Sequence, residues 1–465
     1  MSEAGYLRQI KAPKSRVFRR AFIKRRLALT GLFETDWFEI TKDVMKWGSL
    51  SVQLDDVLLN RFTFGNAKLV MQNDEGSYNP DDSDYSLWNG YLNQQRTLVK
   101  IEAGFLYSSQ GADQIWVNTE HPGSLWDEGS WDSDYWDLSN TQFIGIVSGD
   151  IFISDKSEVT LNIKPLTQVF RDYSARNIRG YNDSVTASRF IELLRDQTDG
   201  SGSYVFRPFF GDTTSNWEIS TTSNVFLNLN TSGAQDVIDS DVWSIVEKLA
   251  QVENFVPFIT RDGVFKFISR ASVATDQTFF EFHGAGSFDS QFGQTIKNIS
   301  AYGPRLTKFY SRVSVKHREA DTTTSYAVAE TSLTVGPASL SWALGERSLN
   351  IENIWIPTST VASTIATTIF NNVSSLKKEI TFKTTFIPGI DILDSVTISY
   401  DPSPAAASSL WDLNDWAEDT TNAAADLVWD QISGNALVLD AASYKLLSIE
   451  MNLDSLENNF VAREE

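Results

Sequence analysis

The 465-residue sequence predicts a mainly β protein with a few helices (β+α), containing a duplicated β domain and an intermediate mixed α/β region. Short apolar or alternating runs are separated by clusters of Gly, Pro, Asn and Asp, which is typical of strands and turns. Few segments have helical periodicity. A strand–turn–strand–insert–strand order occurs in both halves of the chain, which indicates an internal duplication.

Strands are expected wherever apolar residues alternate or run together between turn residues. In the first half these are 37–40, 50–54, 62–71, 97–105, 143–152 and 158–163, with the turn NDEGSYNP at 73–80. Asp262-Gly263 separates two apolar runs at 255–259 and 264–268, which predicts a β-hairpin. In the second half we expect strands at 380–386, 395–400 and 444–453.

Helices are expected at 184–197, 240–252 and 360–376, with a shorter candidate at 165–173. The segment 240–252 begins with Ser-Asp and places Val242, Ile245, Val246 and Leu249 on one face. We interpret these apolar stripes as core packing rather than as binding sites.

Two Trp/Asp inserts distinguish this sequence. The tetrapeptide SLWD occurs at 124–127 and again at 409–412, inside inserts predicted at about 106–141 and 402–443. Trp supplies a large rigid surface, and is therefore favoured at interfaces. The inserts are predicted to pack on neighbouring subunits, to fold back on their own barrel, or to bind sugar. The candidate interface residues there are Trp126, Trp131, Trp136, Trp411, Trp416 and Trp429.

Charge is distributed unevenly along the chain. The first 26 residues contain nine basic residues and one acidic residue, which gives this segment a net charge of +8. Because the whole chain has a net charge of −21, residues 27–465 carry a net charge of −29. A basic arm on an acidic body is predicted to dock on a neighbouring subunit. The candidate interface residues of this arm are Phe18, Phe22, Arg19, Arg20, Arg25 and Arg26.

These features divide the chain into four parts. They are a basic arm at 1–26, a first β domain at 27–175, an intermediate mixed α/β domain at 176–300 and a second β domain at 301–465. No apolar run reaches the roughly 18–20 residues of a membrane span, so no stable membrane binding is predicted.

The sequence predicts no enzyme activity. There is no Cys and there are only three His residues, far apart in sequence, so neither a metal site nor a cofactor is predicted. No nucleophile elbow, phosphate-binding loop or metalloprotease motif is present. The remaining function classes are a structural assembly protein and a carbohydrate-binding protein.

Two segments resemble a known family. The segment 73–104 (NDEGSYNPDDSDYSLWNGYLNQQRTLVKIEAG) and the helix-plus-hairpin segment 242–270 (VWSIVEKLAQVENFVPFITRDGVFKFISR) are similar to regions of baseplate hub or tail-tip proteins of tailed bacteriophages. The resemblance implies two tube-like β-barrels per chain and a homotrimer. Six barrels then form a ring that continues the sixfold tail tube.

The resemblance also implies a location and partners. The protein is expected in the virion, at the phage tail tip or baseplate, after synthesis in the host cytoplasm. Expected partners are tail tube and distal tail proteins, a tip fibre or spike protein and the tape measure protein, with DNA contacted only in transit during ejection. The alternatives are a carbohydrate-binding receptor-recognition protein of the tail and a distal, tube-end tail protein.

A DNA conduit needs a polar wall that does not hold phosphates. In 97–105 we expect Leu98, Lys100, Glu102 and Gly104 on the polar face, with the alternate residues in the core. In 395–401 the expected polar residues are Ser395, Thr397, Ser399 and Asp401.

Overall fold

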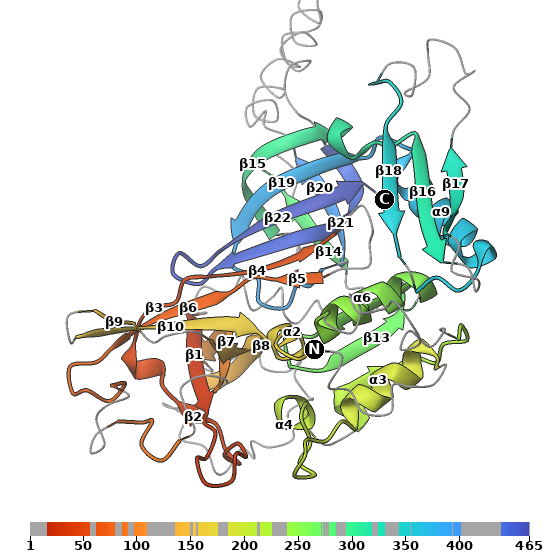
Figure 1. Ribbon diagram of the computed structural model, residues 1–465. Helices are drawn as coiled ribbons and strands as arrows, with labels where there is room; N and C mark the ends of the chain where they lie inside the picture. The colour runs from red at the N-terminus through yellow and green to blue at the C-terminus, as the bar shows by residue number, and fades with distance from the viewer. Residues whose placement is uncertain are drawn as a thin grey trace, which may run out of the picture.

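A computed structural model shows a mostly β architecture of curled sheets with a few helices (Figure 1). The fold class predicted from the sequence is therefore confirmed as mainly β with some helices. The structure describes residues 16–55, 62–79, 86–91, 97–108, 135–148, 152–154, 157–174, 185–211, 214–225, 240–270, 272, 279–284, 294–318, 324–330, 344–353, 355–392, 394–400 and 439–464.

The first sheet has the strand order β2-β1-β7-β8-β10-β6-β3, with β9 paired to β10. All of these pairings are antiparallel. The strands are β1 (Arg16–Lys24), β2 (Phe38–Glu39), β3 (Val44–Lys46), β6 (Ala67–Gln72), β7 (Leu98–Ser108), β8 (Tyr135–Val147), β9 (Phe152–Ser154) and β10 (Glu158–Pro165).

The second sheet closes into a barrel. Its order is β20-β14-β15-β19-β22-β21-β4-β5, and an additional β20–β21 pairing joins the ends of the first six strands. Strands β4 and β5 extend the barrel from β21. The strands are β4 (Ser49–Leu54), β5 (Phe62–Phe64), β14 (Phe279–His283), β15 (Gln294–Pro304), β19 (Lys378–Thr385), β20 (Ser395–Tyr400), β21 (Leu439–Asn452) and β22 (Glu457–Glu464).

The same four-strand topology occurs in both sheets. In the first sheet β6, β10, β8 and β7 are neighbours in that order, and in the barrel β19, β22, β21 and β20 are neighbours in the same order. Every pairing within both sets is antiparallel. In the chain, each set runs in the order first, fourth, third, second. We call these sets the first and second modules, and their identical topology is what an internal duplication predicts.

The mixed α/β region contains α2 (Thr167–Arg171), α3 (Ala187–Arg195), α4 (Arg207–Phe210) and α6 (Val242–Glu253), with the 3₁₀ turn η4 (Thr214–Asn216). These surround a three-stranded sheet of β11 (Trp217–Ile219), β13 (Phe265–Ser269) and β12 (Phe255–Ile259). The predicted hairpin is confirmed, because β12 and β13 are antiparallel around Gly263. Phe170 is fully buried at the centre of an aromatic cluster with Phe206, Phe210, Trp217, Trp243 and Phe265.

A small sheet lies beside the barrel in Figure 1. Its order is β17 (Thr324–Glu330), β16 (Arg312–Arg318) and β18 (Ser348–Glu352), and α9 (Ser359–Val373) packs on it. The 3₁₀ turns η1 (Thr41–Asp43) and η5 (Leu306–Lys308) complete the named elements.

Each of the longer helices begins directly after a polar N-cap residue. Side-chain oxygens of Thr186, Asp241 and Thr358 accept hydrogen bonds from backbone amides in the first turns of α3, α6 and α9. The residues before these caps, which the periodicity had placed inside the helices at 184–197 and 240–252, are outside them. Helix α6 ends at Asn254, whose left-handed conformation (φ 57°) stops the helix.

One expected strand, 62–71, is divided into β5 and β6. The chain turns at Gly65, whose amide donates a 2.7 Å hydrogen bond to the carbonyl of Ser51. A Cβ at this position would lie 2.1 Å from Ser51 Oγ, so a larger residue would require the Ser51 hydroxyl to move. Likewise, β8 ends at Val147 and does not continue through the expected 143–152.

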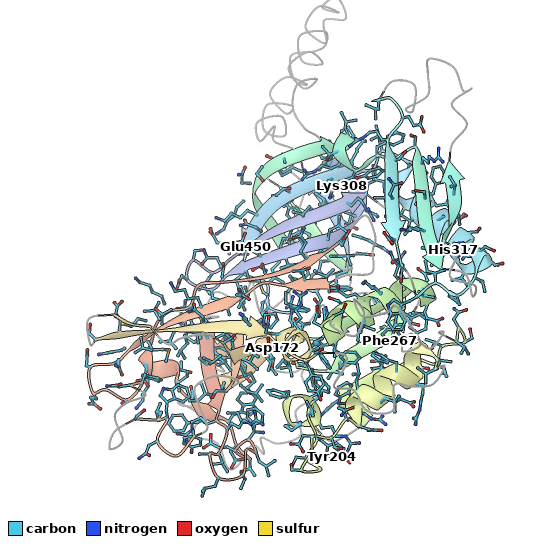
Figure 2. All side chains as sticks on the ribbon, in the orientation of Figure 1. Asp172, Tyr204, Phe267, Lys308, His317 and Glu450 are labelled. Atoms are coloured by element: carbon cyan, nitrogen blue, oxygen red, sulfur yellow. The ribbon has the colours of Figure 1, made fainter. Side chains whose placement is uncertain are left out.

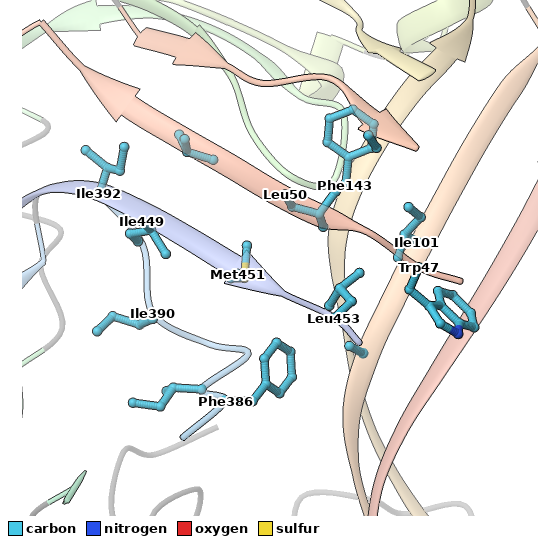
Figure 3. Close-up of a cluster of buried hydrophobic side chains, with 14 of the residues drawn as sticks. Trp47, Leu50, Ile101, Phe143, Phe386, Ile390, Ile392, Ile449, Met451 and Leu453 are labelled. Carbon is cyan, nitrogen blue, oxygen red and sulfur yellow. The ribbon is translucent and has the colours of Figure 1, made fainter. Parts of the chain in front are cut away.

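One apolar core extends from the first sheet into the barrel. Figure 3 shows Ile101 and Phe143 of the first sheet near Leu50 of β4, with Ile449 and Met451 of β21 beside them. Strand β4 carries this continuity, since its residues alternate between exposed and buried and its buried side faces the core. A second core lies between the mixed region and the small sheet.

The N-terminal segment differs from the predicted arm. Residues 16–24 form β1, which pairs with β7 over nine residues and buries Ala21 and Ile23 completely. Its alternation of apolar and basic residues is that of a strand, so part of the predicted arm belongs to this chain's own sheet. Residues 1–15 lie outside the described residues. Strands β4, β5 and β14 and most of β15 also join the barrel from outside 301–465, so the barrel is not confined to the proposed second domain.

Candidate interfaces and the junction between the sheets

Both Trp/Asp inserts connect neighbouring antiparallel strands at the equivalent place in the two modules. The first joins β7 to β8, whose outermost pair is Ser108–Tyr135, and the second joins β20 to β21, whose outermost pair is Tyr400–Leu439. The strands therefore extend further into the predicted inserts than the sequence indicated. Most of the candidate tryptophans lie outside the described residues: Trp126, Trp131, Trp411, Trp416 and Trp429.

Trp136 is in β8, with Tyr107 of β7 as its partner across the ladder. It therefore belongs to a paired strand by its backbone, whereas it was predicted to lie in a loop. Its side chain is outside the description, so its role as an interface residue remains a prediction.

Cations of the N-terminal segment stack on aromatic rings of the same chain. The guanidinium of Arg19 lies 5.4 Å from the ring centre of Trp47, and that of Arg20 lies 5.0 Å from the ring of Phe18. Lys100 of β7 lies 4.5 Å from the ring of Phe22. Such contacts are attractive because the ring face is electron-rich. Phe18 and Phe22 are thus half-buried against cations, with one face of each ring already used within the chain.

Arg25 is held by an ion pair that links three segments. It donates to Glu34 through Nε at 3.0 Å and Nη2 at 2.7 Å, and its guanidinium lies 4.0 Å from the ring of Tyr91. The Tyr91 hydroxyl also donates to Glu34 at 2.7 Å. Burial alone raises the pKa of Glu34, but the hydrogen bonds from Arg25 and Tyr91 outweigh it and the pKa is lowered. Arg26, the last cation of the predicted arm, lies over Phe33.

The residues that carry the family resemblance have structural roles. Tyr78 of NDEGSYNP is fully buried and donates a 2.7 Å hydrogen bond from its hydroxyl to Asp43, and Asn73 accepts the backbone amide of Tyr78 at 2.8 Å. Burial raises the pKa of Tyr78, and the neighbouring carboxylate of Asp43 raises it further. In SLWNGYL, Ser86 Oγ accepts the amide of the buried Trp88. The described residues of this segment therefore fix loops against the first sheet.

A buried arginine connects the mixed region to both sheets. Arg261, 8% exposed in the β12–β13 turn, donates to Gln142 Oε1 of β8 at 3.2 Å and to the carbonyl of Pro388 at 3.1 Å. It also donates to the carbonyl of Ile390. Asp391 lies 3.6 Å away. Because Pro388 and Ile390 lie in the β19–β20 connection, one side chain ties the hairpin to the first sheet and to the barrel.

Gln142 completes this junction. Its side-chain amide donates to the carbonyls of Ala103 at 3.4 Å and Pro388 at 3.0 Å, while its oxygen accepts from Arg261. Sequence reasoning identified Arg261 only as part of a turn and did not identify Gln142. Neither position shows a local pattern that separates it from exposed polar residues.

A second link fixes the chain where it passes from the first sheet to the barrel. Asp454, in the β21–β22 turn, accepts the amides of Trp47 at 3.0 Å and Gly48 at 3.2 Å. The side chain of Arg19 donates to the carbonyl of Leu453 in the same turn. Residues about 400 positions apart in sequence are therefore joined at this crossing.

The predicted face of β7 is confirmed for its core side. Thr97, Val99, Ile101 and Ala103 are all fully buried, as expected, and the side chain of Phe105 is outside the description. Leu98 and Gly104, expected on the polar face, are instead buried, Leu98 by the second core. On β20, Thr397 and Ser399 are half-buried on the expected polar side, whereas Ser395 is buried. Asp401 lies outside the described residues.

Within the described residues no three His, Asp or Glu side chains are grouped to hold a metal ion. A cavity of about 200 Å³ lies between α6 and α9. There Glu253 accepts a 2.9 Å hydrogen bond from the side chain of Asn224, and burial raises its pKa. Among the described helices none is long and apolar enough to cross a membrane.

No family model matches the sequence, and no curated protein matches it. The structure is similar to the tail protein from Neisseria meningitidis MC58, at 10% identity and a TM-score of 0.47, over 96% of this chain and 97% of that one. It is also similar to the prophage tail protein gp18 from Listeria monocytogenes EGD-e, at 7% identity and 0.46, over 96% and 94%. The prophage MuSo2 43 kDa tail protein from Shewanella oneidensis matches at 12% and 0.45, over 96% of both chains.

Two of these structures are prophage tail proteins and the third is a tail protein. Their identities are 12% or lower and their TM-scores lie below 0.5, so the function is argued from this chain's own residues.

Proposed function

We propose that the chain is a structural protein of a bacteriophage tail, at the baseplate hub or tail tip. The observation that carries this proposal is the duplicated module, in which β6, β10, β8 and β7 repeat the topology of β19, β22, β21 and β20. The segments that resemble hub proteins support it. In the structure these segments fix loops and join sheets, as expected of an assembly protein without a catalytic role.

Duplication gives the proposed ring its geometry. Three copies with two modules each present six similar modules, so a threefold ring can face a sixfold tube. Tail tube and distal tail proteins are the proposed partners on one side of this ring, and a tip fibre or spike protein on the other. The two inserts leave equivalent module ends, where six Trp-rich connections would surround the ring.

The proposed conduit is lined by the polar faces of the sheets. On β4 the exposed residues are Ser49, Ser51 and Gln53, which carry no charge. On barrel strands β15, β19 and β22 the carboxylate of Glu457 pairs with both Lys297 and Lys383, which leaves one net positive charge in this group. A wall of this kind offers few cations to DNA phosphates and favours transit over binding.

Mass measurement on purified tail tips tests the proposal. We expect three copies of this chain per tip, arranged so that first and second modules alternate around the ring. A single copy or six copies in the tip would overturn the threefold ring. Binding of the isolated chain to a soluble glycan, without incorporation into tails, would favour the carbohydrate-binding alternative instead.

A further inference from the structure

A basic groove lies where the barrel meets the small sheet. It is lined by Arg305, Lys308, Lys377 and Arg463 around the carboxylate of Glu379. Glu379 has a side chain only 3% exposed, and it lies 2.8 Å from Arg305 Nε and 3.0 Å from Lys308 Nζ. Figure 2 shows Lys308 at this end of the barrel. The base of the groove is therefore a buried carboxylate that holds two cations in place.

Positive charge continues across the neighbouring strands. Arg463 of β22 lies directly between Glu379 of β19 and Lys445 of β21 in the ladder. We define the basic groove as these four cations together with Lys445, so that it contains five cations around the carboxylate of Glu379. Glu464 follows Arg463 and pairs opposite Tyr444, so strand alternation places it on the other face.

A strongly acidic segment leaves the same end of the barrel. Strands β20 and β21 separate at the pair Tyr400–Leu439, five residues along β20 from the pair Ser395–Lys445. Five strand residues span about 17 Å. The connection 401–438 contains seven carboxylates and no Lys or Arg: Asp401, Asp412, Asp415, Glu418, Asp419, Asp426 and Asp430. If extended, its 38 residues would span a much greater distance than the one from the pair Tyr400–Leu439 to the groove.

We propose that the basic groove binds the acidic connection 401–438 of the same chain. Charge complementarity supports this pairing, on a molecule whose net charge is −21. The tether supports the same chain over a second copy, because a linked segment has an effective concentration in the millimolar range. The proposal does not depend on the role in a phage tail.

Zero-length carbodiimide cross-linking of the full-length protein tests this directly. We expect Lys308, Lys377 and Lys445 to be cross-linked to carboxylates of 401–438. When ¹⁴N-labelled and ¹⁵N-labelled proteins are mixed, the two cross-linked peptides should carry the same label, because the contact lies within one chain. Lys297 and Lys383, which flank Glu457 on the same barrel, serve as control amines. The six carboxylates of 109–134 serve as control acids. Coupling should disappear in 1 M salt, where the Debye length is about 3 Å.

Charge reversal gives an independent readout. The double variant Lys377→Glu with Lys445→Glu should raise the rate of chymotryptic cleavage after Trp411 and Trp416 by about threefold to fivefold. The control variant Lys297→Glu should leave that rate unchanged. Circular dichroism shows whether both variants are folded. If a variant does not fold, the cross-linking of the wild-type protein still tests the proposal.

Three outcomes would overturn the proposal. Coupling mainly between chains of different isotopic label would assign the groove to a second copy. Equal coupling of the control lysines, or of the acids in 109–134, would show that the groove has no preference for this segment. Displacement of the segment by duplex DNA at 0.15 M salt would show that the groove binds phosphates instead.

Discussion

The guanidinium of Arg261 and the side-chain oxygen of Gln142 are 3.2 Å apart, and this hydrogen bond joins the β12–β13 turn to the first sheet. The same guanidinium reaches two carbonyls of the β19–β20 connection. Three parts of the chain that are distant in sequence therefore depend on one buried cation. In an assembly protein, such a junction fixes the relative positions of the two modules and so the geometry of the ring we propose.

Replacement of this arginine tests the junction. Arg261→Ala removes a buried charge and leaves the carbonyls of Pro388 and Ile390 without these donors, so we expect a loss of about 2–3 kcal/mol in the free energy of unfolding. Lys266→Ala on the next strand is the control, since its partner Glu218 is 52% exposed and the pair should contribute less than about 1 kcal/mol. Chemical denaturation measures both. Equal losses in the two variants would contradict a special role for Arg261.

The hairpin turn makes a second prediction. Gly263 has φ of 82°, and a Cβ there would approach Ile144 Cδ1 at 3.4 Å and Leu166 Cδ1 at 3.6 Å. Gly263→Ala should therefore destabilise the protein by about 1 kcal/mol through backbone strain. Gly200→Ala is the matched control, because no atom lies within 4 Å of its Cβ position. A thermal midpoint for Gly263→Ala at or above that of Gly200→Ala would show that the turn is not strained.

The lowered pKa of Glu34 predicts a pH dependence. Because the folded state lowers the pKa below its ordinary value of 4.5, the ionised carboxylate stabilises the protein above that pH. This stability is lost as the pH falls through the folded value. Glu34→Gln should thus be less stable than wild type by about 1–2 kcal/mol at pH 7, and the difference should shrink as the pH falls below 4.5.

Thermal unfolding between pH 7 and pH 3 checks this prediction. Glu75→Gln, an exposed residue of the 73–80 turn, is the control and should stay close to wild type throughout. A Glu34→Gln difference that grows on acidification would have the wrong sign and would refute the argument.

Local signals in the sequence predicted most elements. The strand 395–400 is β20 residue for residue, and α6 follows its Asp241 cap. The pairing of β4 with β21 was not predictable, because 50–54 reads as an ordinary alternating strand. This pairing, for example of Gln53 with Ser448, joins residues about 400 positions apart in sequence. Closure of the barrel by β20–β21 depends on shorter-range contacts across the second insert, between residues 39 to 50 positions apart.

The candidate site was less predictable than the fold. Charge and aromatic content marked the N-terminal segment as unusual, but composition does not separate a free arm from a strand such as β1. The basic groove combines Arg305, Glu379 and Arg463 from three strands or turns that are distant in sequence. No spacing rule connects them. In contrast, the strands on either side of the inserts were predictable, because turn and strand signals are local, although β7, β8 and β21 extend into the predicted inserts.

The last prediction separates the two parts of the N-terminal segment. Deletion of 1–26 removes β1, whose nine ladder pairs and two fully buried side chains, Ala21 and Ile23, complete the first sheet. Its loss would expose the edge of β7 and open the first core, so we expect a large drop in the thermal midpoint and aggregation through the exposed edge. Deletion of 1–15 leaves β1 in place and should keep the midpoint within a few degrees of wild type. If the basic residues before β1 dock on a neighbouring subunit, this shorter deletion should nevertheless reduce incorporation into tails. Normal folding after deletion of 1–26 would show that β1 is dispensable to the first sheet.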